Sequence, residues 1–127
     1  MTSLSRRYVA IGAFLTMLSV IIGAFGAHML SPYIGEQHMK TYETGVQYQM
    51  IHSIGLLLIG ILASVWGESR RLLWGARLLV IGIILFSGSL YALSITGLDV
   101  FGPITPLGGL AFIIGWIFVV AAAMKRK

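Results

Sequence analysis

The sequence predicts an all-α polytopic membrane protein, folded as an antiparallel bundle of four transmembrane helices. The 127 residues are 57% hydrophobic and only 10% charged, whereas about a quarter of the residues of a soluble domain are charged. Four apolar runs of about 20 residues, enough for a helix to cross a hydrocarbon core of about 30 Å, lie at 8–30, 46–66, 72–95 and 105–124. They leave no room for a further domain, so we expect residues 1–127 to form a single membrane domain.

Lysine and arginine lie almost entirely on one side of these runs. Threading the chain through a bilayer places eight of the nine Lys and Arg residues on one side and only Lys40 on the other. The eight are Arg6, Arg7, Arg70, Arg71, Arg77, Lys125, Arg126 and Lys127. Because cytoplasmic loops hold an excess of basic residues, we expect both termini in the cytoplasm. The cations flank spans and do not line one face, so we expect no nucleic-acid partner.

The first apolar run follows a short polar tail, residues 1–7. An alternative is that this run is a cleaved export signal, but it exceeds the usual apolar signal core of about 7–15 residues. Ser31-Pro32 is expected to end the first helix, because proline disfavours helical geometry in the residue before it. Residues 35–48 have a helical pattern, so the second helix is expected to begin outside the bilayer.

Two short connections join the remaining runs. The inner turn at 67–71 is tight enough to make the helices on either side antiparallel neighbours. In the second outer connection, 97–106, Thr105 suits a helix N-cap and Pro106 a first helical turn. The alternative is that this segment dips into the membrane, which needs protein or water to cover its backbone.

Small residues recur at steps of three, four or seven within the apolar runs. Lipid tails are as apolar as leucine, so helices in a membrane associate through close backbone approach, which small residues permit. The candidate packing residues are Gly12, Gly23, Gly26, Gly82, Gly108 and Gly115. The alternative is that glycine is simply common in membrane helices. If the stripes are interfaces, Gly23→Leu is expected to destabilise the bundle or oligomer.

Polar side chains gather in the outer half of the predicted bundle. The candidate cluster is His28, Glu43, Gln47, Tyr48, His52, Ser87, Ser89 and Tyr91. Ionisable groups inside a membrane are costly and suggest a function. The sequence leaves open a structural role, with His28 or His52 bridging helices, and a proton-linked or ligand-binding role. It also leaves open the protonation state of these histidines.

Metal binding and catalysis are weakly supported by the sequence. Cysteine is absent, and no pair of donors has a compact metal-ligand spacing such as His-Glu-x-x-His. Ser87-Gly88-Ser89 lacks the Gly-x-Ser-x-Gly context of a hydrolase nucleophile. We therefore expect no metal, no cofactor and no enzymatic activity.

Four motifs, together spread over nearly the whole chain, resemble a known family. They are GAFGAH at 23–28, YETGVQYQ at 42–49, FSGSLY at 86–91 and ITPLGG at 104–109. The chain resembles the uncharacterised small membrane proteins catalogued as domain of unknown function number four-two-three. This resemblance implies a multi-pass protein of the bacterial plasma (inner) membrane with no assigned activity.

Three functions are compatible with these observations. The first is a structural or accessory membrane protein that acts through membrane lipids, a membrane-protein partner or its own oligomer. The second is an oligomeric transporter or channel for protons or a small solute, built on the outer His/Glu/Gln cluster. The third is a lipid-modifying enzyme, which requires a base beside a nucleophile in a pocket open to the bilayer. Whether the polar side chains meet around a water-accessible cavity distinguishes the first two.

Overall fold

The computed structural model describes residues 3–125, and every regular element within that range is a helix. The elements are α1 (Ser3–Phe25), a π-helical turn (Gly26–Leu30), α2 (Ser31–Trp66), α3 (Arg70–Gly82), a second π-helical turn (Ile83–Ser87), α4 (Gly88–Thr96), a 3₁₀ turn (Asp99–Phe101) and α5 (Ile104–Lys125). The prediction of an all-α fold is confirmed. The expectation that the first helix follows residues 1–7 is wrong for residues 3–7, because α1 already begins at Ser3.

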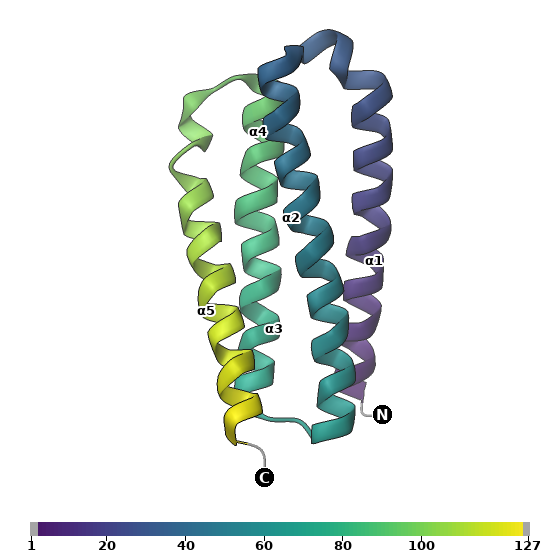
Figure 1. Ribbon diagram of the computed structural model, residues 1–127, viewed down its shortest axis with the longest axis vertical. Coiled ribbons are helices and arrows are strands. Elements are labelled where there is room, and N and C mark those ends of the chain that lie inside the picture. The colour runs from purple at the N-terminus through teal and green to yellow at the C-terminus, as the bar shows by residue number, and fades with distance from the viewer. Residues whose placement is uncertain (1–2, 126–127) are drawn as a thin grey trace.

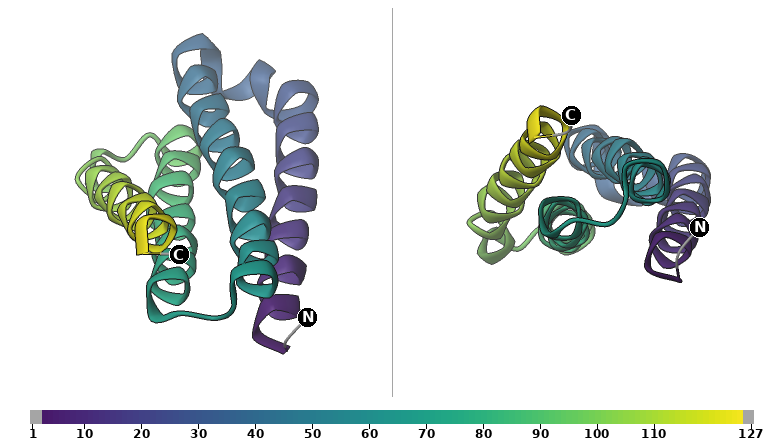
Figure 2. Two further views of the ribbon diagram at one scale, coloured as in Figure 1. Left: turned by 60° about the horizontal axis from the view of Figure 1, so that its bottom comes forward. Right: turned by 90° about the horizontal axis from the view of Figure 1, so that it is seen from below.

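The helices stand side by side along one common direction (Figure 1). α2 and the α3–α4 rod occupy the middle, while α1 packs on α2 and α5 packs on α3 (Figures 1 and 2). The start of α1, the end of α5 and the 67–69 connection share one end, called here the terminal end. The opposite, distal end holds the α1–α2 reversal and the 97–103 connection.

The reversal between α1 and α2 takes place at Gly35. Its φ of 82° and ψ of 168° interrupt an otherwise helical stretch, and glycine reaches a positive φ at little steric cost. The expectation that Ser31-Pro32 ends the first helix is therefore wrong. Pro32 lies in the first turn of α2, where a missing backbone donor removes no hydrogen bond.

Within residues 3–125, three stretches of the chain are helical, long and apolar enough to cross a membrane. They are Ser3–Trp66, Arg70–Thr96 and Asp99–Lys125, of 64, 27 and 27 residues. The predicted count of four spans is not confirmed, because the first of these three stretches contains both α1 and α2, joined across the Gly35 break. The fold is an all-helical arrangement of long apolar segments.

Five of the eight cations predicted for one side lie at the terminal end, and Arg77 lies further into α3, over the Trp74 ring. Arg6 and Arg7 lie in the first turns of α1, Arg70 and Arg71 begin α3, and Lys125 ends α5, all at the terminal end. Arg126 and Lys127 lie outside the described residues.

The start of α5 differs from the expected cap. α5 begins at Ile104, one residue before Thr105, and the Thr105 hydroxyl forms a 2.6 Å hydrogen bond with the Ser89 hydroxyl of α4. Thr105 therefore joins two helices and does not serve as the N-cap. The connection before it forms a 3₁₀ turn at the distal end. Whether it dips into a membrane stays a prediction.

α1 and α2 approach each other closely at Gly12. A Cβ atom there would lie 2.6 Å from the Leu57 backbone nitrogen and 2.7 Å from the Ser53 carbonyl oxygen. Beside this contact, the Thr16 hydroxyl donates to the Ser53 hydroxyl at 2.9 Å. Toward the terminal end, the Ser5 hydroxyl donates to the Gly60 carbonyl. The two helices are thus joined by backbone contact and by short polar bonds.

The α3–α5 half of the bundle is built in a similar way. A Cβ atom at Gly108 would lie 2.7 Å from Cα of Phe86, and one at Gly115 would lie 3.1 Å from the Leu79 side chain. The flat ring of Phe112 covers Gly82. The buried residues of the two halves meet in one apolar cluster that includes Leu56, Leu79 and Phe112.

The Gly12 contact predicts a sharp difference between two glycine-to-alanine variants. Gly12→Ala forces a methyl group against the α2 backbone, and overpacking of this kind costs about 1–3 kcal/mol. Gly88→Ala is the matched control, since nothing lies within 4 Å of the Cβ position there. Unfolding in mixed detergent micelles should show a lower stability for Gly12→Ala and no loss for Gly88→Ala. Equal stability of Gly12→Ala and the parent protein would contradict the close α1–α2 approach.

Candidate functional site

Gln49 of α2 connects three helices. Its side-chain nitrogen donates to the Leu15 carbonyl oxygen of α1 at 2.9 Å. Its side-chain oxygen accepts from the Tyr91 hydroxyl of α4 at 2.6 Å. The Gln49 residue is only 3% exposed. A buried amide with both ends bonded stabilises its position, whereas an unpaired amide in an apolar surrounding is costly.

Further hydroxyl groups bridge neighbouring helices at the same level. The Ser87 hydroxyl, in the second π-helical turn, donates to the Gly45 carbonyl oxygen at 2.7 Å. The Tyr42 hydroxyl donates to the Ile22 carbonyl oxygen at 2.7 Å, and the Ser89–Thr105 bond joins α4 to α5. These residues and Gln49 form what we call the interhelix network. Its hydrogen bonds connect the helices in the distal half of the bundle.

His52 contacts its neighbouring helix through its ring face. Its Nδ1 lies 2.8 Å from the Tyr48 carbonyl oxygen on the same helix, and because a carbonyl only accepts, Nδ1 is the donor. The imidazole stacks on Phe112 of α5 with ring centroids 3.6 Å apart. The Trp116 ring lies 5.8 Å away and is tilted. The contact between His52 and α5 is therefore aromatic stacking.

The structure divides the predicted polar cluster into two groups. Ser87, Ser89 and His52 are buried and Tyr91 is half-buried, all of them bonded or stacked between helices. The others are exposed: His28, Glu43, Gln47 and Tyr48. Of these four, Tyr48 also packs its ring against Phe86 of the second π-helical turn, with ring centroids 4.5 Å apart. The eight side chains do not meet around one polar space. His28 lies exposed in the first π-helical turn. This position requires no contact with a neighbouring helix.

Three residues of the interhelix network, Gln49, Tyr42 and Thr105, lie outside the predicted cluster. Gln49 and Tyr42 are buried. Gln49 stands three residues before His52 in an apolar run, which places the two on one helix face. That spacing is the sequence signal that could have identified Gln49 as an interior polar residue. Tyr42 packs against Gly26, where a Cβ atom would overlap the tyrosine ring, and spacing along the chain does not reveal this contact.

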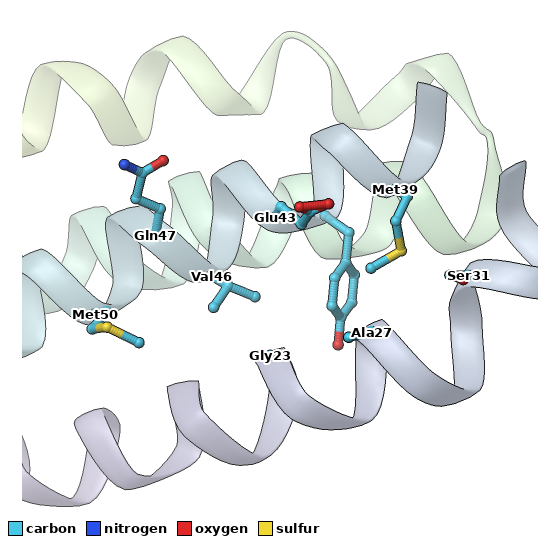
Figure 3. Close-up of a pocket in the computed structure, with 9 residues that line it drawn as sticks. Gly23, Ala27, Ser31, Met39, Glu43, Val46, Gln47 and Met50 are labelled. Carbon is cyan, nitrogen blue, oxygen red and sulfur yellow. The ribbon is translucent and has the colours of Figure 1, made fainter. Parts of the chain in front are cut away.

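A groove opens between α1 and α2 near the distal end (Figure 3). Its volume is about 590 Å³, within the roughly 300–1,000 Å³ of small-molecule sites. The lining residues are Gly23, Ala27, Ser31, Met39, Tyr42, Glu43, Val46, Gln47 and Met50. Figure 3 shows Val46 extending from α2 toward α1, where Gly23 and Ala27 lie, while Gln47 points away from α1. We call this the lateral groove.

The lateral groove continues into a shallower hollow that carries charge. Ser31, Met39 and Glu43 line both spaces, and Glu36 and Lys40 line the hollow. Among residues 3–125, no three His, Asp or Glu side chains stand close enough together to hold a metal ion. The groove thus combines an apolar floor with a charged mouth at the end of α2 nearest to Gly35.

Comparison with known proteins places the chain in a family. The family model described as "Protein of unknown function (DUF423)" matches residues 22–109. This chain belongs to the DUF423 family. The matched range includes the Gly35 reversal, the side chains of the interhelix network and every residue that lines the lateral groove.

Relatives of this DUF423 chain occur in bacteria and are named as membrane proteins. It is 45% identical to the UPF0382 membrane protein YwdK of Bacillus subtilis, over 94% of this chain and 98% of that protein. It is 42% identical to the UPF0382 membrane protein SH2409 of Staphylococcus haemolyticus, over 94% and 97%. No solved structure matches the chain. This DUF423 chain is therefore a membrane protein of a bacterial family without an assigned activity.

Removal of the Tyr91 hydroxyl should weaken the interhelix network. In Tyr91→Phe, the Gln49 side-chain oxygen loses its donor, and interhelix hydrogen bonds in membranes average about 0.6 kcal/mol with a maximum near 1.7. We expect a loss in this range from detergent unfolding. Tyr33→Phe is the control because Tyr33 is 85% exposed. Combining Tyr91→Phe with Gln49→Leu should cost less than the sum of the single variants, and additivity would show that the two side chains are not coupled.

Proposed function

We propose that this chain crosses a bacterial plasma membrane four times, with both termini in the cytoplasm. The helical stretch Ser3–Trp66 would be about 96 Å long if straight, about three times the thickness of a hydrocarbon core. The positive φ of Gly35 and the side-by-side packing of α1 and α2 support two crossings (Figure 1). The cations at the terminal end support its cytoplasmic location.

The proposed orientation is testable with single cysteines because the parent chain has none. In intact cells, a membrane-impermeant maleimide should label Gln37→Cys, at the distal end, and should leave Glu68→Cys unlabelled until the membrane is opened. Both positions are exposed, so accessibility to the reagent depends on the side of the membrane. Labelling of Glu68→Cys in intact cells would contradict the orientation.

For its activity, we propose a non-enzymatic structural or accessory role in the membrane. The supporting observation is that the interior polar side chains bond to other helices. Gln49, Tyr91 and Ser87 all do so and are not directed at a shared cavity. Such a bundle presents a fixed outer surface. Large apolar side chains cover that surface, including Phe14 and Val20 on α1 and Ile113 on α5. Lipids and other membrane proteins are the partners such a surface suits.

The transporter alternative gains no support from the side-chain arrangement. It requires the outer His/Glu/Gln cluster to converge, but His28, Glu43 and Gln47 are exposed while His52 is stacked on Phe112. The lipid-enzyme alternative requires a base next to a nucleophile. The lining of the lateral groove offers the Ser31 hydroxyl and the Glu43 carboxylate, but no hydrogen bond joins these two side chains in the described part of the chain.

Purified protein in liposomes provides the test of the accessory role. With a proton gradient and a pH-sensitive dye inside, we expect proton flux equal to that of protein-free liposomes. The parent and the His52→Ala variant should behave alike, since His52 lines no conduit in the described chain. Proton flux that depends on protein and falls in His52→Ala would overturn the proposal in favour of transport.

A further inference from the structure

We infer that the lateral groove binds one aminophospholipid. An acyl chain lies along the apolar floor between α1 and α2, the headgroup ammonium pairs with Glu43, and the phosphate lies near Lys40. The inference rests on the proposed membrane location and goes beyond it by naming a ligand class and a site. Three features support it: the composition of the groove, its depth and its charge.

The floor of the groove suits a hydrocarbon chain. Gly23 of α1 and Ala27 of the first π-helical turn face Val46 of α2, with Met39 and Met50 at either end (Figure 3). Methionine side chains are flexible and adapt to irregular apolar shapes. Tyr42 also lines the groove, and its hydroxyl is already bonded to the Ile22 carbonyl oxygen. An apolar chain can therefore lie there without leaving a polar group unpaired.

The position along α2 matches the boundary between hydrocarbon and headgroup. The predicted span begins at Val46, so Met50 lies about 6 Å inside that boundary and Glu43 about 5 Å outside it, at 1.5 Å per residue. The apolar end of the groove is thus at acyl-chain depth. Its charged end is at headgroup depth. A phospholipid has the same order of apolar and charged parts along its length.

The charges at the mouth favour an ammonium next to a phosphate. Glu36 and Glu43 supply two carboxylates and Lys40 one ammonium, so the three charged side chains sum to minus one. His38, although on the same helix, faces Gly97 near the end of α4, because its ring lies 3.5 Å from the Cβ position there. A carboxylate accepts charge-assisted hydrogen bonds from a primary ammonium. Phosphatidylglycerol lacks that group and adds net negative charge.

Photolabelling in liposomes tests this site directly. The full chain is reconstituted in phosphatidylcholine with a trace of phosphatidylethanolamine that carries a diazirine in its acyl chain, or with a phosphatidylglycerol probe of the same acyl chain. Adducts are mapped by mass spectrometry of peptides. We expect the phosphatidylethanolamine probe to label residues 23–27 and 39–50 about three-fold more than the phosphatidylglycerol probe, the factor expected of one ion pair at a wet surface.

The exposed face of α5 serves as an internal control. Leu110, Ile113 and Ile117 contact lipid without charged side chains beside them, so both probes should label this face equally. Preference for phosphatidylethanolamine at the groove alone supports the site. Equal labelling by the two probes at the groove, or a preference for phosphatidylglycerol there, overturns it.

Two substitutions separate the headgroup contact from the acyl-chain contact. Glu43→Gln keeps the shape and should reduce the preference from about three-fold to about one. Glu68→Gln, a carboxylate at the terminal end, should leave the preference unchanged. Gly23→Leu places a side chain in the groove, where only Val46 lies near its Cβ position, at 3.1 Å, and should reduce groove labelling by both probes.

Folding of each variant is checked by its melting temperature in detergent. If Gly23→Leu fails to fold, the Glu43→Gln and Glu68→Gln pair still decides the question, because both positions are exposed. An unchanged preference in Glu43→Gln overturns the inference. Liposomes hold the probe in both leaflets, so this result does not depend on the cellular orientation. A failed lipid site therefore leaves the four-span proposal standing, and a failed orientation leaves the labelling result interpretable.

Discussion

Lipid tails surround an apolar helix as favourably as another apolar helix does, so helices in a membrane need a further reason to associate. In this chain the backbone of α1 meets the backbone of α2 at Gly12, where no side chain fits between them. At the Gly108–Phe86 contact, the backbone of α5 meets the backbone of the second π-helical turn in the same way. Close approach brings many atoms into contact at once and strengthens van der Waals attraction. The other features of the bundle depend on this separation.

The interhelix network follows from that short separation. The Gln49 side chain is long enough to reach carbonyl and hydroxyl partners on two other helices only because those helices are close. In the second π-helical turn, the Ser87 hydroxyl reaches the Gly45 carbonyl oxygen of α2. The lateral groove forms where close approach ends. At Gly23 the nearest α2 atom to a Cβ would belong to the Val46 side chain, not to the backbone.

The sequence predicted the helical class, the apolar segments and the common side of five of the described cations, because composition and the length of apolar runs depend only on local chemistry. It predicted that the first helix ends at Ser31-Pro32, whereas the helix breaks at Gly35, since proline fits a first helical turn as well as it ends a helix. The preference of Gly35 for a positive φ is not visible in a helical pattern. The Thr105 cap was wrong because the partner of its hydroxyl, Ser89, lies on another helix.

The candidate site was less predictable than the fold. The sequence grouped eight polar residues of the outer half, but spacing along one helix does not tell a residue that bonds to another helix from one that is exposed. Ser87 and Glu43 illustrate the two outcomes. The lateral groove depends on how far α1 and α2 diverge. That distance is set by several side chains from both helices together.

Disulfide trapping of α1 against α2 in native membranes tests the central contact most directly. The Thr16 and Ser53 hydroxyl oxygens lie 2.9 Å apart, and the parent chain has no cysteine. The account predicts that Thr16→Cys combined with Ser53→Cys forms an intramolecular disulfide on mild oxidation. Thr16→Cys combined with Ser64→Cys, near the far end of α2, should remain reduced. Failure of the first pair to cross-link, or equal cross-linking of both pairs, would contradict the account.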